Sequence, residues 1–124
     1  MRFLEGRTSK GGHYSPGVIA GGMLYVSGQL PTDPQTGKIA EGGIREQTRQ
    51  ALENVARVLA SAGLGSENVV MCHVYISDMQ NWDAVNEAYA AFFGTHKPAR
   101  AVIPTRDLHH GALVEIEAIA EMQE

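Results

Sequence analysis

The sequence has one cysteine, no long hydrophobic run and fewer basic than acidic residues, and each shortage excludes a class of protein. With only Cys72, no disulfide can form within the chain, which favours an intracellular, cytoplasmic location. No stretch of 18 apolar residues exists, so the sequence predicts no membrane-spanning helix. The opening residues, MRFLEGRTSKGGHY, have no apolar run after the first cation, and we therefore expect no secretory signal.

The charge balance argues against a protein that binds nucleic acid. Ten Lys and Arg residues stand against 14 Asp and Glu residues, which gives a formal net charge of −4 at pH 7. The basic residues are scattered, whereas a nucleic-acid partner requires a basic face. Hydrophobic residues make up 44% and charged residues 19% of the 124 residues, a composition that predicts one globular domain over residues 1–124.

Two segments have the apolar spacing of amphipathic helices. Residues 44–62 repeat apolar side chains at helical intervals, and Gly63 is placed to end that helix. Residues 81–93 form a second helix of the same kind, with Asn81 as the expected N-cap. Both helices therefore have one face made to pack against other elements.

The remaining ordered segments have strand patterns. Residues 17–31 predict two short strands around Gly21–Gly22, a pair suited to a two-residue hairpin. Residues 68–77 are almost continuously apolar and β-branched, which is typical of a central strand covered on both faces. Further strands are expected at residues 1–5, 99–104 and 112–122.

The order of elements, β-β-β-α-β-α-β-β, favours an α+β domain in which a mixed sheet carries both helices on one face. The second face of such a sheet also needs cover. Because so short a chain has no further element to supply, we expect another copy of the chain to provide it.

Charged side chains interrupt two of the expected strands. Side chains alternate along a strand, so Glu115 and Glu117 share one face. That face is either a solvated edge or the wall of a cleft in which a carboxylate holds a water or a substrate proton. Arg100 raises a similar question. It either pairs with one of these glutamates on a neighbouring strand or waits for a substrate carboxylate, which its planar fork of donors would match.

The histidines, the cysteine and one tyrosine carry weaker signals. His73 is typical of a satisfied core or interface residue, and Cys72 of a buried small hydrophobe. His109 and His110 are adjacent and would face opposite ways on a strand, and without a spaced third ligand they predict no metal site. Tyr14 lies in a Gly-rich loop, where it either lines a ligand site or is exposed to solvent.

The most specific motif lies near the C-terminus, where PAR at 98–100 is followed by Leu108 and by VEI at 114–116. Three other segments accompany it: YVSGQLP at 25–31, ALENVARVLASAGL at 51–64 and VNEAYAAFF at 85–93. In content and order these segments resemble the RidA/YjgF family, the reactive intermediate imine deaminases. The resemblance extends from about Tyr14 to Ala120.

The resemblance implies a chorismate-mutase-like α+β fold. Three copies would form a barrel-like homotrimer, with the helices outside and the sites in clefts between subunits. The implied activity is the hydrolysis of reactive 2-imino or enamine acids, such as 2-iminopropanoate and 2-iminobutanoate, to 2-keto acids and ammonia. The resemblance implies no cofactor and no metal for this reaction.

The resemblance also assigns roles to individual residues. Arg100 matches the arginine that grips the substrate carboxylate, and Glu115 matches the glutamate that hydrogen-bonds the attacking water or the departing amine. Tyr14, Ser27 and Asn86 match residues that line the family's pocket. Arg100 and Glu115 are therefore the expected catalytic pair.

Two positions in the strand at 99–104 are unusual. RidA proteins usually carry a cysteine two residues after the arginine, and Val102 stands there. Its backbone still offers contacts to a ligand, so the departure bears on substrate preference rather than on the deaminase chemistry. Pro104 cannot donate to a sheet ladder and is expected to end the strand early.

Two other functions remain open on the sequence. One is a pathway-specific enamine deaminase, such as one that acts on an aminomuconate-like acid. The other is a non-catalytic trimer that binds a small carboxylate and regulates a partner.

Overall fold

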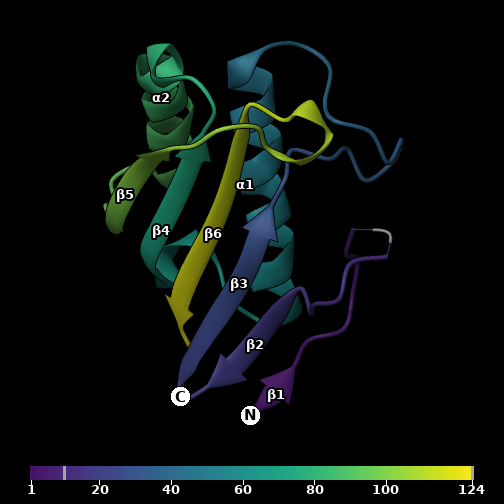
Figure 1. The fold of residues 1–124 in the computed structure, drawn as a ribbon. Helices are drawn as coiled ribbons and strands as arrows, with labels where there is room; N and C mark the ends of the chain where they lie inside the picture. The colour runs from purple at the N-terminus through teal and green to yellow at the C-terminus, as the bar shows by residue number, and fades with distance from the viewer. Residues whose placement is uncertain (10, 124) are drawn as a thin grey trace.

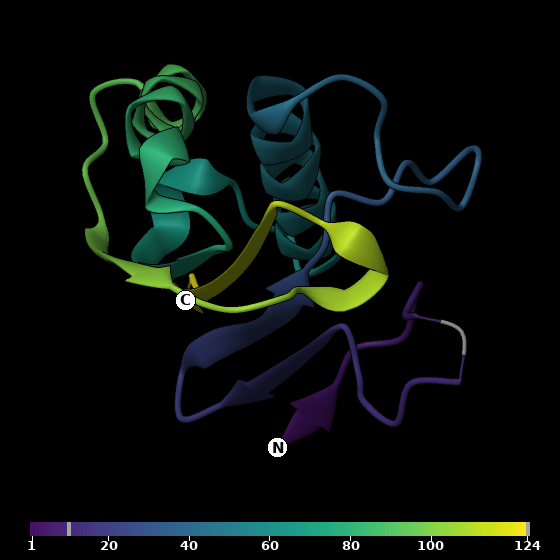
Figure 2. The ribbon, with the colours of Figure 1, turned by 45° about the horizontal axis from the view of Figure 1, so that its top comes forward.

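The computed structural model describes residues 1–9 and 11–123, and it consists of one mixed β-sheet with two helices packed on one of its faces (Figures 1 and 2). The strand order is β1-β2-β3-β6-β4-β5. The strands are β1 (Arg2–Phe3), β2 (Gly17–Ala20), β3 (Met23–Gln29), β4 (Val69–Ile76), β5 (Ala99–Pro104) and β6 (Val114–Glu121), and the helices are α1 (Ile44–Ser61) and α2 (Trp82–Phe93). The expected α+β architecture is confirmed, with three short 3-10 turns added: η1 (Ser66–Asn68), η2 (Met79–Asn81) and η3 (His109–Gly111).

The hairpin between β2 and β3 forms where the glycine pair predicted it. Gly21 and Gly22 have φ angles of 59° and 77°, which residues with a side chain rarely adopt, and Ala20 pairs directly with Met23 across the turn. The first expected strand is shorter than residues 1–5, because only Arg2–Phe3 pairs with β2.

The centre of the sheet comes from segments far apart in the sequence. β6 lies between β3 and β4 and pairs antiparallel with both. β5 is an edge strand that pairs in parallel with β4, reached through α2 as a crossover. Arg100 therefore neighbours β4 rather than the strand of the two glutamates, which argues against the alternative in which Arg100 pairs with a glutamate on an adjacent strand.

The core lies between the sheet and the two helices. Every second residue of β6 is buried toward the helices, and the apolar stripe of α1 packs over β3 and β6. The same alternation holds in β4, where Cys72, Val74 and Ile76 are fully buried while His73 and Tyr75 are partly exposed. The continuous apolar strand is thus covered on only one face within a single chain, and the expectation of cover on both faces is not met there.

The helix ends show one agreement and one correction. Gly63, with φ 75°, follows α1 as expected. Asn81 occupies the N-cap position of α2, but its side chain makes no capping hydrogen bond. Asn81 is also the last residue of η2. The N-cap of η2 is Asp78, whose side chain accepts a 2.9 Å hydrogen bond from the Gln80 N–H.

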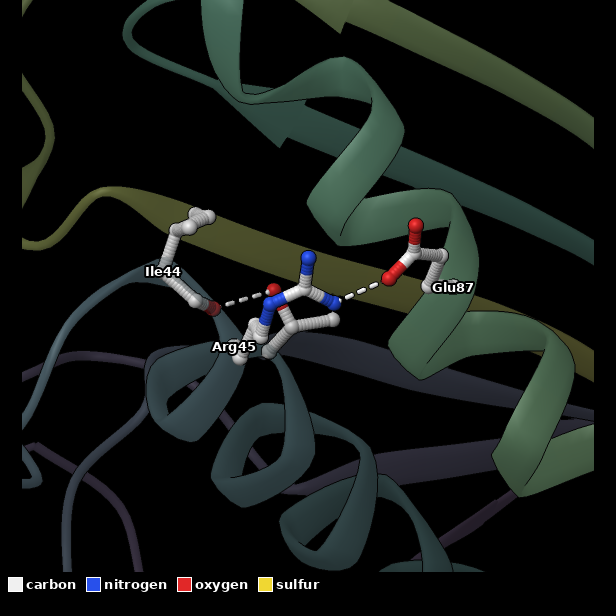
Figure 3. Close-up of polar contacts among 4 residues, drawn as sticks. Ile44, Arg45 and Glu87 are labelled. Carbon is white, nitrogen blue, oxygen red and sulfur yellow. Dashed lines mark hydrogen bonds and ion pairs between the residues drawn. The ribbon is translucent and has the colours of Figure 1, made fainter.

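The two helices are joined at the surface by an ion pair between Arg45 and Glu87 (Figure 3). In the same turn Thr48 donates to the Ile44 carbonyl at 2.7 Å. Both partners of the ion pair are more than half exposed, so the pair contributes little to stability. Over the described ranges, no helix is long and apolar enough to cross a membrane.

Candidate functional site

A hollow opens on the face of the sheet opposite the helices. Its wall is formed by the Gly-rich loop before β2, the end of β3, the turn η3 and β6. The lining residues are Ser9, Gly11, Gly12, Tyr14, Ser27, Gly28, Leu30, His109, Glu115 and Glu117. Three residues that the sequence nominated, Tyr14, Ser27 and Glu115, are therefore brought together here.

A bulge in β3 shapes the floor of this hollow. The pairing with β6 shifts between Val26 and Gln29, so an extra residue is accommodated beside the two glutamates. A Cβ atom on Gly28 would stand 2.6 Å from the Oε2 atom of Glu115. Only a glycine at this position lets the carboxylate lie against the backbone of β3.

The Glu115 carboxyl is half-buried, and its surroundings disfavour its ionised form. Burial raises its pKa above the ordinary value, and the neighbouring charge of Glu117 raises it further. The charge of His109 acts in the opposite direction and lowers this pKa. Among residues 1–9 and 11–123, no side chain or backbone group hydrogen-bonds this carboxyl, so it is available to a ligand.

Glu117, in contrast, is held by its neighbours on β4. Its Oε1 atom accepts a 2.7 Å hydrogen bond from the Tyr75 hydroxyl and lies 3.2 Å from the Nδ1 atom of His73. This bond raises the pKa of the Tyr75 hydroxyl. Glu115, which the sequence predicts to be catalytic, is therefore the carboxylate of this face that has no hydrogen-bond partner among the described residues.

The hydroxyls of the hollow are engaged in local hydrogen bonds. The Tyr14 oxygen accepts from the Ser9 N–H at 2.6 Å and donates to the Ser9 Oγ at 3.1 Å, which closes the Gly-rich loop on itself. Ser27 Oγ donates to the Ser15 carbonyl at 2.6 Å. Tyr14 is 42% exposed, so its ring forms an open wall of the hollow rather than a packed one.

Arg100 lies on the opposite side of the sheet, against α2. It pairs with the buried Cys72 on β4, and its Nη1 atom donates to the Asn86 Oδ1 at 2.9 Å. The guanidinium carbon lies 4.8 Å from the ring centre of Tyr89 and 5.6 Å from that of Trp82. An amide oxygen and two aromatic faces thus hold the cation in place.

Among residues 1–9 and 11–123, the surroundings of Arg100 supply no counter-charge. Within the part of the chain that the structure describes, Arg100 forms no ion pair, and β4 separates it from the glutamates of β6. The Tyr89 hydroxyl beside it is buried without a hydrogen-bond partner there. Burial raises the pKa of Tyr89 and the pKa of the Cys72 thiol, so both stay neutral next to the cation.

Val102 and Pro104 complete the edge strand. Val102 pairs with Val74 and lies partly buried on the same side of the sheet as Arg100. β5 ends at Pro104, which pairs with Ile76 as the last residue of the ladder, in agreement with the expectation that this proline ends the strand.

The nominated residues therefore form two separate groups. One group, in the hollow, is Tyr14, Ser27 and Glu115, and the other, at the edge of the sheet, is Asn86, Arg100 and Val102. Because Arg100 faces the helices while the glutamates face away from them, one small ligand cannot contact both within a single chain.

Sequence reasoning missed several neighbours of these groups. His109 and His110 lie between the expected strands at 99–104 and 112–122, and they form the turn η3. This turn brings His109 into the hollow, and no periodicity in the sequence signals it. Trp82 and Tyr89, the two aromatic rings beside Arg100, lie at helical spacing within residues 81–93, and that spacing predicts a buried helix face rather than contact with a cation.

Comparison with known proteins gives consistent matches along the chain. Residues 6–122 match the family described as endoribonuclease L-PSP. A RutC family protein of Pyrococcus horikoshii is 43% identical over 118 residues, which cover 95% of this chain and 94% of that protein. A human 2-iminobutanoate/2-iminopropanoate deaminase is 38% identical over 109 residues, or 88% and 80% of the two chains. The crystal structure of E. coli TdcF with bound serine superposes with a TM-score of 0.89, at 34% identity and over 99% and 100% of the two chains.

Proposed function

The chain belongs to the endoribonuclease L-PSP family, which includes the RidA/YjgF proteins, and we propose that it is a hydrolytic deaminase of reactive 2-imino acids. The substrates are small 2-imino or enamine acids such as 2-iminopropanoate and 2-iminobutanoate, and the products are 2-keto acids and ammonia. The observation that carries this proposal is Arg100, a positioned guanidinium whose described surroundings offer it no anion. A small substrate with a carboxylate would supply the missing charge.

Arg100 binds the substrate carboxylate. One N–H group of Arg100 donates to Asn86, and the ring faces of Tyr89 and Trp82 restrict the rotation of the guanidinium. The remaining N–H donors of Arg100 are therefore oriented before the ligand binds. Each charge-assisted hydrogen bond is worth about 1.5–3 kcal/mol. This clamp fixes the imine carbon in position, which lowers the entropic part of the barrier. Serine, the ligand in the E. coli TdcF structure, is a small amino acid with a carboxylate of this kind.

Glu115 is the general base for the attacking water. Its carboxyl has no partner among the described residues of the hollow, and its raised pKa makes it a better proton acceptor than an ordinary glutamate. Water adds to the imine carbon and passes one proton to Glu115, which gives a tetrahedral carbinolamine. The carbinolamine collapses with cleavage of the C–N bond, and ammonia leaves while the carbonyl forms.

The complete site requires two copies of the chain. Arg100 and Glu115 lie on opposite sides of one sheet, so the β5 edge of one subunit completes the hollow of another. This arrangement agrees with the homotrimer that the family resemblance implies. It also covers the exposed apolar side chains of the open sheet face, among them Phe3 and Tyr25, which are 63% and 47% exposed.

Ribonuclease activity, which the family description names, is less well supported by this site. The hollow presents two carboxylates, Glu115 and Glu117, to any ligand, and a phosphodiester would be repelled by both. The net charge of −4 adds to this repulsion. His73 and His109 lie beside these acids rather than in a basic groove. The deaminase is therefore the function that the geometry favours.

The direct test is release of ammonia and keto acid from freshly generated 2-iminobutanoate, with an amino-acid oxidase or a dehydratase as the source. We expect the wild-type protein to accelerate release and Arg100→Ala to lose the acceleration. A folded Arg100→Ala that keeps wild-type rates would refute the clamp. Equal rates with and without wild-type protein would refute the deaminase, and binding of 2-oxobutanoate without turnover would then identify a small-carboxylate receptor.

A further inference from the structure

The turn η3 directs one of its two histidines into the hollow. His109 lines the hollow with Glu115, whereas His110 does not. His110 adopts a left-handed backbone, with φ 60° and ψ 22°, which is uncommon for a residue other than glycine. The two rings contact each other at a tilt of 49°, with their centroids 3.8 Å apart.

The turn is anchored where it joins β6. The backbone N–H of Leu113 donates to the side-chain oxygen of Gln47 at 2.8 Å, and Gln47 is only 7% exposed. Within the turn, the N–H of Gly111 donates to the Leu108 carbonyl at 3.2 Å. A buried side chain of α1 therefore holds the segment between η3 and Glu115, which lies two residues beyond Leu113.

Among the described residues that line the hollow, His109 is the side chain best suited to donate a proton to a ligand. The Tyr14 and Ser27 hydroxyls already donate to Ser9 and Ser15, and Glu117 is occupied by Tyr75 and His73. An imidazole can donate a proton from one form and accept one in the other, so the same side chain can serve both halves of the reaction. Imine hydrolysis needs such a group, because the nitrogen must gain protons while water is losing them.

On the basis of the deaminase function proposed above, we propose that His109 is a second catalytic residue, the acid that protonates the substrate nitrogen opposite the base Glu115. As water adds, Glu115 takes a proton from the water and His109 gives one to the imine nitrogen. As the carbinolamine collapses, Glu115 returns its proton to the nitrogen and His109 accepts the hydroxyl proton. The C–N bond breaks with its electron pair on nitrogen, and both residues regain their starting states.

The charged groups around His109 support this division of roles. His109 lines the hollow together with Glu115 and Glu117 from β6 and with Tyr14 from the Gly-rich loop, and within its own turn its ring contacts that of His110. A protonated imidazole at this position is attracted by both carboxylates, and its charge lowers the pKa of Glu115. A cationic His109 therefore favours the ionised form of Glu115, which is the form that accepts a proton from water.

His109→Asn and His110→Asn form a matched pair for the test, because asparagine tolerates the left-handed backbone at position 110. With 2-iminobutanoate at pH 7, we expect His109→Asn to lower kcat about 100-fold or more and to remove the alkaline limb of the kcat profile. His110→Asn is expected to stay within about threefold of wild type, and added imidazole to restore part of the rate of His109→Asn only. His109→Gln provides a second variant of the same kind if His109→Asn does not fold.

The outcomes separate this inference from the proposed function. An active wild type with unchanged rate and pH profile in His109→Asn would overturn the role of His109 and leave the deaminase standing. A wild type without activity would overturn both. An equal loss in His109→Asn and His110→Asn would show a structural contribution of the turn and would also overturn the catalytic role. As a contact readout, 2-oxobutanoate should shift the imidazole NMR signal of His109 more than that of His110.

Discussion

At the scale of single residues, the proposed site depends on a cation and a carboxylate that have no charged or hydrogen-bonded partner of opposite sign among the described residues. Arg100 is held by an amide oxygen and two aromatic faces, which orient a guanidinium without neutralising it. Glu115 lies in a hollow that raises its pKa and gives it no hydrogen bond in that part of the chain. By contrast, Arg45 and Glu87 neutralise each other's charge at the surface. Unsatisfied, positioned charges are typical of groups that await a ligand.

Arg100→Lys tests the shape of the clamp as distinct from its charge. Lysine keeps the positive charge but loses the planar fork, so we expect kcat/KM for 2-iminobutanoate to fall about tenfold to 100-fold, mainly through a higher KM. Arg106→Lys, on the exposed connection after β5, is the control and should leave kcat/KM unchanged. An Arg100→Lys enzyme as active as wild type would show that charge alone is recognised.

Glu115→Gln tests the raised pKa through protein stability. The folded chain holds a proton on Glu115 above the ordinary pKa of 4.5, where the unfolded chain has released it, so wild-type stability falls as pH rises through this window. The glutamine side chain of the variant does not titrate, so its contribution to stability is the same at every pH. We therefore expect the variant to have the higher Tm at about pH 8 and a Tm close to wild type at about pH 4.

The same substitution has a kinetic readout. The base must be ionised, so the acid limb of the wild-type kcat/KM profile should lie above 4.5, and Glu115→Gln should lose turnover at every pH. Glu117→Gln is the companion variant. It removes the second cause of the raised pKa and should move the acid limb to lower pH. An acid limb that Glu117→Gln does not move would contradict this electrostatic coupling.

At the scale of elements, the site is made by departures from regular strands. The bulge in β3 brings Gly28 against Glu115, and the turn η3 brings His109 to the same hollow. On the other side, β5 carries Arg100 at an edge and ends at Pro104. Regular ladders alone would place the glutamates on a flat face with no cavity.

Gly28→Ala tests the bulge. The added Cβ would stand 2.6 Å from the Glu115 Oε2, so the carboxylate must move and we expect kcat to fall at least about tenfold. The backbone at Gly28 is not left-handed, so Tm should change little. Gly43→Ala is the control, because the nearest atom to its added Cβ would be 3.9 Å away and it lies outside both groups of site residues. Wild-type turnover in Gly28→Ala would show that the carboxylate position is not critical.

How far the sequence predicted these elements depends on the range of the interaction. The periodicity of α1 and α2, the glycine hairpin and the alternation in β6 are local, and they identified the elements within one or two residues. The neighbour of β5 is set by a crossover through α2, which no local pattern encodes. For that reason the sequence left open whether Arg100 pairs with a glutamate, and the strand order answers that it does not neighbour their strand. The turn at His109 and His110 was missed because adjacent histidines have no strong preference for strand or turn.

At the scale of the whole molecule, the proposed site is divided between the two sides of the sheet in a single chain. Its sheet has one face packed on helices and another that exposes Phe3, Tyr25 and the hollow. The two groups of site residues lie on opposite faces of that sheet, whose helix-covered and open sides can be followed in Figure 2. Assembly of three copies would cover the open face and join the two groups with one set of contacts, so that oligomerisation and catalysis depend on the same surface.

The most direct test of this central claim is complementation between two inactive variants, Arg100→Ala and Glu115→Gln. The two are refolded together at equal concentration, with light scattering to establish that trimers have formed, and assayed for keto-acid release from 2-iminobutanoate. If each site takes Arg100 from one subunit and Glu115 from another, random mixing leaves about one site in four with both residues intact. We therefore expect about a quarter of the wild-type rate from the mixture, with neither variant active alone. A mixed trimer that is no more active than its separate components would place both residues of a site in one chain and contradict the account.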